Sequence, residues 1–139
     1  MIRHAASKAT TAKFVQADAL DLPMSDGTFD VVLLASLINV VPDRVKLLHE
    51  VQRVLKPGGK ISVLFPTPAF TGEKAEEIVT NRNLDYFSSA AISFWASFGR
   101  KLTPSDVSGE IAAVGFGKPK IALLFDNNIA SVTATKKTT

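Results

Sequence analysis

Three short apolar runs and one amphipathic segment organise the first half of the chain. Residues 14–17 (FVQA) predict a short strand, and Phe29–Ala35 is nearly continuous in apolar residues, as in a strand buried on both faces. Residues 43–55 place apolar side chains at three- and four-residue spacing, which predicts a helix with one buried stripe. A Lys-Pro-Gly-Gly turn at 56–59 ends that helix, and residues 60–65 predict a third strand. Strand, helix, turn and strand form a βαβ unit, so its two long strands should be parallel.

The second half predicts more helix and a closing hairpin. Residues 71–80 are polar and form a short helix or a loop, whereas 103–114 start with a capping Thr103 and with Pro104 in the first helical position. Residues 119–125 and 129–135 read as two strands joined by an Asp-Asn-Asn turn. The predicted fold class is therefore α/β, with a mostly parallel sheet closed by a C-terminal antiparallel hairpin.

A further helix is predicted over residues 84–98, and it carries an aromatic stripe. Packing in the core is the more usual role for such a stripe, and lining a ligand pocket is the alternative. The stripe consists of Leu84, Phe87, Ala91, Phe94, Trp95 and Phe98.

The size and composition of the chain indicate one modest domain. Its 139 residues contain 46% hydrophobic and 21% charged residues, and no apolar run reaches the ~20 residues of a membrane helix. We expect a soluble, cytoplasmic protein with a domain over 14–137. Residues 1–13 are basic and rich in Ala, Ser and Thr, and we expect a poorly ordered tail there, a transit peptide being the rarer alternative.

Composition also limits the chemistry. The absence of cysteine excludes disulfides, thiolate metal sites and a Cys nucleophile, and His4 and His49 are too isolated for a metal cluster. A net charge of +3, with basic residues scattered along the chain, gives no positive indication of nucleic-acid binding. We therefore expect no metal, and no catalytic dyad is visible.

Candidate binding residues follow the predicted strands. In open α/β sheets, ligands bind beyond the carboxyl ends of the strands, which here are Asp18-Ala19, Leu34-Ala35-Ser36 and Pro66-Thr67. A carboxylate at such a position can accept hydrogen bonds from an adenine amino group or a ribose hydroxyl. Asp18 could equally cap the segment that follows it.

Four motifs, in this order and spacing, resemble class I S-adenosylmethionine-dependent methyltransferases (methyltransferase type 11) of the kind found in ubiquinone and menaquinone synthesis. They are Asp18-Ala-Leu-Asp-Leu-Pro23, Asp26-Gly-Thr-Phe-Asp-Val-Val32, Asn39-Val-Val-Pro-Asp43 and Arg53-Val-Leu-Lys-Pro-Gly-Gly59. The resemblance implies a Rossmann-like fold, S-adenosylmethionine as cofactor and a small-molecule methyl acceptor.

The resemblance also assigns roles to residues. Asp18 would bind the adenine amino group, Ala19 would flank the ring, and Leu34, Ala35 and Ser36 would lie near the methionine part. The helix over 84–98 would form a lid, with Tyr86, Phe87 and Trp95 lining an apolar acceptor site. No catalytic residue is assigned, because the cofactor is already activated and the protein mainly orients and desolvates.

One part of the family pattern is not found before the first predicted strand. The glycine-rich cofactor turn and the first two strands of such enzymes have no counterpart, since every glycine lies at or after Gly27. We therefore expect a truncated domain whose central strand exposes an edge that could support a homo- or hetero-oligomer. The alternative function is a non-catalytic remnant or a partner-dependent interaction module. Half of a nicotinamide-dependent dehydrogenase is disfavoured, because no glycine fingerprint opens the fold.

Overall fold

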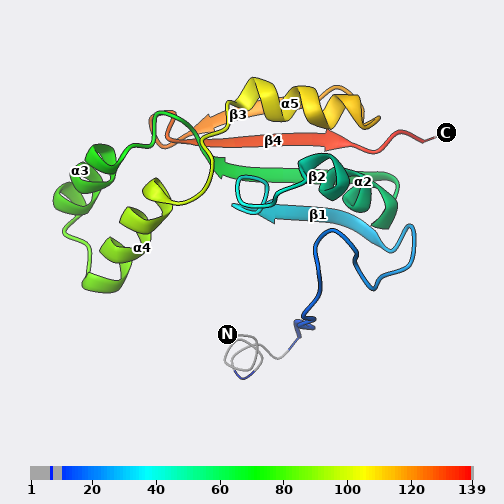
Figure 1. Cartoon of the computed structure of the whole chain (residues 1–139), viewed down its shortest axis with the longest axis horizontal. Coiled ribbons are helices and arrows are strands. Elements are labelled where there is room, and N and C mark those ends of the chain that lie inside the picture. The colour runs from blue at the N-terminus through cyan, green and yellow to red at the C-terminus, as the bar shows by residue number, and fades with distance from the viewer. Residues whose placement is uncertain (1–6, 8–10, 139) are drawn as a thin grey trace.

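The computed structural model of the chain describes residue 7 and residues 11–138 (Figure 1). The predicted tail over 1–13 falls mostly outside this part. The elements, in chain order, are β1 (Phe29–Ala35), α2 (Arg44–Val54), β2 (Leu55–Pro66), α3 (Gly72–Arg82), α4 (Tyr86–Ser97), α5 (Pro104–Ala113), β3 (Lys120–Leu124) and β4 (Ile129–Thr135).

The four strands form one sheet in the order β1-β2-β4-β3. β1 and β2 are parallel, as the βαβ pattern predicts, whereas β2 with β4 and β3 with β4 are antiparallel. The closing hairpin is confirmed, but the prediction of a mostly parallel sheet is wrong: the sheet is mixed. The reason is that the hairpin supplies half of the strands, and β4 inserts between β2 and β3.

The βαβ unit forms for the reasons visible in the sequence. The Asp43 carboxylate caps α2 by accepting a hydrogen bond from the Lys46 N–H at 2.9 Å. The predicted apolar stripe is buried on the sheet, where Leu47, Leu48 and Val51 are at most 1% exposed. The predicted turn over 56–59 instead lies within β2 and makes an irregular start to the strand, with Gly58 at φ +76°.

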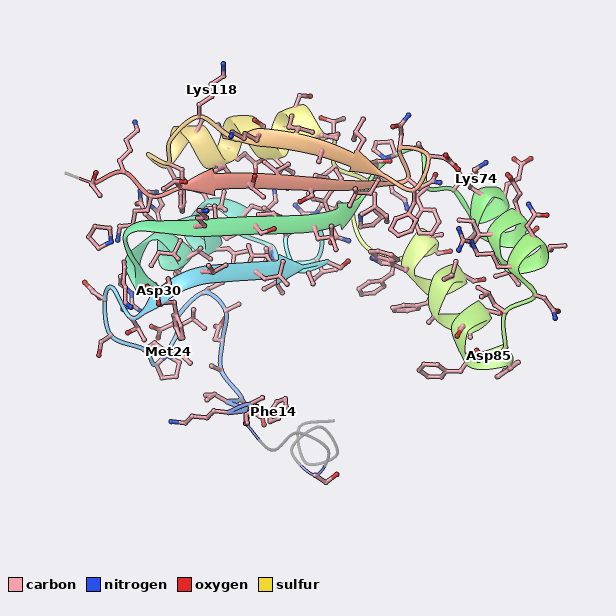
Figure 2. The ribbon with its side chains drawn as sticks, turned by 180° about the vertical axis from the view of Figure 1, so that it is seen from behind. Phe14, Met24, Asp30, Lys74, Asp85 and Lys118 are labelled. Carbon is pink, nitrogen blue, oxygen red and sulfur yellow. The ribbon has the colours of Figure 1, made fainter. Side chains whose placement is uncertain are left out.

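The helices α2 and α5 cover the same face of the sheet. Their buried side chains join those of β2 and β4 in one core cluster, which includes Leu48, Phe65 and Ile111. Figure 2 shows the opposite face, and no described helix crosses it. On β1 this leaves Val31 and Leu33 59% and 62% exposed, and β1 is an edge strand within the described chain.

The strand predicted over residues 14–17 is wrong. These residues are in no regular element and pair with no strand among those described, and Phe14 and Val15 are 39% and 44% exposed. Apolar composition alone does not make a strand, because its backbone groups also need a partner in a ladder.

The helices α3 and α4 form a hairpin beside the carboxyl ends of β1 and β2 (Figure 1). Thr71 and Asp85 cap the two helices, and Asn83 in the left-handed conformation ends α3. The core role expected for the aromatic stripe of α4 is wrong for Phe87, Phe94 and Phe98, which are 81%, 61% and 50% exposed. The face of α4 that packs inward carries Ile92 and Ala96 instead.

Candidate functional site

The carboxyl end of β1 is fixed by an unusual backbone conformation at Ser36. Its φ of +53° lies in the left-handed region, which a residue other than glycine adopts at a cost. Two hydrogen bonds hold it: the Ser36 N–H donates to the Leu64 carbonyl at 2.8 Å, and Trp95 Nε1 donates to Ser36 Oγ at 2.5 Å. Backbone strain of this kind is commonly stored at functional sites.

Leu34 and Ala35 are the last two residues of β1, and Ser36 follows them. Leu34 points into the core and is 5% exposed, while Ala35 is exposed and Ser36 half-buried. Trp95 joins this group through its indole N–H, although it lies 59 positions later in the chain. No sequence signal pointed to that contact, because it depends on how the α3–α4 hairpin packs.

Asp18 lies in a short turn before β1. Its carboxylate accepts a hydrogen bond from the Leu20 N–H at 2.9 Å, and its carbonyl accepts one from the Asp21 N–H at 3.1 Å. Of the two roles open to Asp18, the structure thus displays the capping one. The side chain remains exposed, so a carboxylate with spare acceptor capacity also faces solvent. No hydrogen bond between described residues joins this turn to Ser36.

Two residues of α2 position this turn and the connection after it. The Arg53 guanidinium donates to the carbonyls of Leu22 and Met24 at 3.0 and 2.7 Å. It also pairs with Glu50 and Asp26 at 2.6 and 2.7 Å. Arg53 belongs to the last of the four sequence motifs, but nothing in that motif indicates a role as an anchor.

Glu50 completes the anchor. Its carboxylate accepts hydrogen bonds from Arg53 and from the Leu22 N–H, the latter at 2.7 Å. The Arg53 hydrogen bond is the main cause that lowers the pKa of Glu50 to about 2, and the Leu22 N–H adds to it. Ala19 and Leu20, held by this connection, pack on the main core.

The expected acceptor residues separate into two groups. Tyr86 and Phe87 are 91% and 81% exposed at the start of α4, near the labelled Asp85 in Figure 2. Trp95 instead lines a cavity between the α3–α4 hairpin and the β3–β4 turn. Of the three, only Trp95 also touches the end of β1.

Asn39 lies in the segment between β1 and α2. It is 2% exposed, and its side-chain oxygen Oδ1 has no hydrogen-bond partner in the described structure. Its carbonyl accepts a hydrogen bond from the Arg100 N–H at 2.9 Å, which ties the end of the α3–α4 hairpin to this segment.

The described residues lack both a metal-binding cluster and a membrane-spanning helix. No group of three or more His, Cys, Asp or Glu side chains there could hold a metal ion. No described helix is both long and apolar enough to cross a membrane.

The sequence of the chain is similar to those of methyltransferases. Residues 1–63 match the family described as "Methyltransferase domain". The ubiquinone/menaquinone biosynthesis C-methyltransferase of Idiomarina loihiensis is 48% identical over 52 residues, which are 37% of this chain and 21% of that protein. The demethylmenaquinone methyltransferase of Thermus thermophilus is 45% identical over 67 residues, 48% of this chain and 30% of that protein. The chain thus spans less than a third of the length of these relatives.

A solved structure extends the likeness to the whole chain. Human N-acetylserotonin methyltransferase, in complex with S-adenosylmethionine, aligns with 99% of this chain and 38% of its own, with a TM-score of 0.64 and 18% identity. At this identity the likeness concerns the fold. Residues 1–63 thus match a methyltransferase domain, and the fold of the chain is the Rossmann-like one that solved methyltransferases also adopt.

Proposed function

We propose that the chain takes part in methyl transfer from S-adenosylmethionine to a small-molecule acceptor. The observation that carries the proposal is the strained, doubly hydrogen-bonded Ser36 at the carboxyl end of β1, where open α/β sheets bind their ligands. When bound, S-adenosylmethionine supplies an activated sulfonium methyl group for attack by an acceptor oxygen, nitrogen or carbon.

The residues present fit parts of this cofactor. In the proposed arrangement, the exposed Asp18 carboxylate accepts a hydrogen bond from the adenine amino group, and the small Ala19 leaves room beside the ring. Ala35, Ser36 and the backbone of Leu34 flank the methionine part, since the Leu34 side chain is buried in the core. S-adenosylmethionine is an extended molecule with adenine and methionine at opposite ends, so the two groups of residues need not touch each other.

The protein's contribution to the reaction is orientation and exclusion of water. Trp95, fixed by Ser36, places an apolar wall beside the end of β1. We propose that the acceptor binds against α4 at this wall, with Phe87 and Tyr86 as outer contacts. We also propose a cytoplasmic location and association, with a second copy or another chain, along the open edge of β1.

Isothermal titration with S-adenosylhomocysteine tests the proposal. We expect saturable binding with a dissociation constant on the order of 0.1–1 mM, since few polar groups contact the ligand. Asp18→Ala should weaken it by about five- to tenfold through loss of a charge-assisted hydrogen bond. Asp21→Ala is the matched control, because Asp21 is also exposed and lies in the same turn.

Two outcomes of this titration contradict the proposal. One is the absence of saturable heat. The other is an equal loss of affinity in the Asp18 and Asp21 variants, which would indicate a disturbed turn and not a lost contact. Light scattering on the same samples reports association along β1, which would give at least twice the mass of a single chain.

A further inference from the structure

A cavity of about 540 Å³ lies between the α3–α4 hairpin and the β3–β4 turn. Seven of its ten lining residues are apolar, among them Phe70, Leu84, Ile92 and Phe125. Its size and largely apolar walls are those of small-molecule sites in proteins. Figure 2 shows the hairpin that forms one side, with Lys74 and Asp85 marking its two helices.

Hydrogen bonds and ring packing within the protein hold the walls of the cavity in place. The Thr67 N–H donates to the Asn128 carbonyl at 2.9 Å and Thr67 Oγ1 donates to the Asn127 carbonyl at 2.6 Å, so the β3–β4 turn is tied to the end of β2. On the other side, Phe70 and Trp95 meet edge to face with ring centroids 5.8 Å apart. The cavity is therefore largely preformed, which lowers the entropy lost on binding.

Two opposite charges line the cavity without pairing with each other. Arg82 and Asp126 both line it, and no ion pair joins them. Lys74 pairs with Glu77 at 2.7 Å, and its pKa is raised by that hydrogen bond first and to a lesser degree by nearby Asp126. Asp126 thus has a cation close by, whereas Arg82 has no acidic partner within the described part of the chain.

A further cation lies behind the Phe70 wall. Lys101 Nζ donates to the carbonyls of Phe70 and Ala96 and lies 6.0 Å from the centre of the Phe70 ring. Arg82 is therefore a cation at the wall of an apolar interior, and no described acidic side chain forms an ion pair with it. A hydrophobic molecule with one acidic group matches this distribution.

We propose that the cavity binds the hydrophobic body of an acid, with Arg82 as the partner of its carboxylate or other acidic group. The inference rests on the proposed function, because it identifies this acid with the methyl acceptor. Trp95 lines the cavity and also reaches Ser36, so a ligand here lies one side chain away from the proposed cofactor position. Contacts remote from the reacting atoms can then contribute to orientation.

The single tryptophan makes the test direct. Trp95 is the only tryptophan in the sequence, so its emission reports the cavity in the full chain. Titration with octanoate should shift this emission with a dissociation constant on the order of 1 mM. Arg82→Gln should weaken octanoate binding by about three- to fivefold, as expected for a solvent-exposed ion pair. Asp126→Asn should strengthen it by roughly twofold, because it removes a repulsive charge.

Two controls test whether the effect comes from the charge at Arg82. One control removes the acidic group from the ligand, and the other changes the net charge of the protein at a distant site. 1-Octanol, which lacks the acid, should bind all variants alike. Lys118→Gln makes the same charge change at the far end of the molecule, away from α3 and α4 in Figure 2, and should leave octanoate binding unchanged. An unchanged Trp95 emission, or equal effects of the Arg82 and Lys118 variants, would overturn the inference. S-adenosylhomocysteine is absent from this experiment, so its outcome is independent of failure at the cofactor position.

Discussion

Replacing Gly99 with alanine is expected to lower the free energy of unfolding by about 2–4 kcal/mol, one of the two largest effects expected for a single substitution. Gly99 adopts a φ of +81°, which disfavours any residue with a side chain. An added Cβ would also lie 2.5 Å from Asn39 Nδ2 and 3.1 Å from the Asn39 carbonyl oxygen. Because Gly99 follows α4 and packs against Asn39 in the segment after β1, relief of this clash must move either Asn39 or the end of the hairpin.

Urea denaturation followed by Trp95 emission measures both the loss of stability and the change in structure around Trp95. The midpoint should fall, and the emission of the folded variant should shift to longer wavelength as the Trp95–Ser36 contact loosens. Gly109→Ala is the control: Gly109 lies within α5, and a Cβ there would meet nothing within 4 Å. This second variant should gain roughly 0.5–1 kcal/mol from helix propensity. A Gly99 variant as stable as the unsubstituted protein would contradict the contact described at Asn39.

Replacing Glu50 with glutamine is expected to cost roughly 2 kcal/mol at pH 7 and much less near pH 2. The folded-state pKa of Glu50, about 2, lies below its ordinary value of 4.5. Its contribution to stability is therefore fully present above pH 4.5 and is lost as the pH falls through 2. The variant should show a flatter dependence of stability on pH over this interval.

Denaturation curves collected from pH 7 to pH 2 test this expectation. Glu76→Gln on α3 serves as the matched control, since Glu76 is exposed and forms no ion pair with any described residue. It should leave the pH dependence unchanged. Parallel curves for the Glu50 variant and the unsubstituted protein would show that Glu50 does not anchor the connection before β1.

Local sequence patterns predict the βαβ unit and α5 well, because each has its determinants close together in the chain. The spacing of Leu47, Leu48 and Val51 and the Thr103 cap are sufficient to locate α2 and α5. Residues 14–17 carry a similar apolar pattern, yet they form no strand, since a ladder needs a partner that local sequence does not specify. The mixed sheet was missed for the same reason, because pairing of β4 with β2 is a long-range property.

Local sequence likewise predicts only part of the candidate site. Motif order and spacing suggested Asp18 and Leu34–Ser36, and their roles toward the cofactor stay predictions. The left-handed Ser36, the Trp95 hydrogen bond and the Arg53 anchor depend on contacts between distant parts of the chain, so no local pattern marks them. The exposure of Phe87 and Phe94 on α4 likewise reflects what packs against the helix and not its composition.

The central claim is that S-adenosylmethionine binds at the turn of Asp18 and at the carboxyl end of β1. An NMR titration of the ¹⁵N-labelled chain with S-adenosylhomocysteine tests it most directly, because each amide reports its own surroundings. We expect saturable shifts at Asp18, Ala19, Ala35 and Ser36 and at the Trp95 indole N–H, with Gly109 and Gly117 unchanged. Shifts confined to other parts of the chain, or none at all, would contradict it.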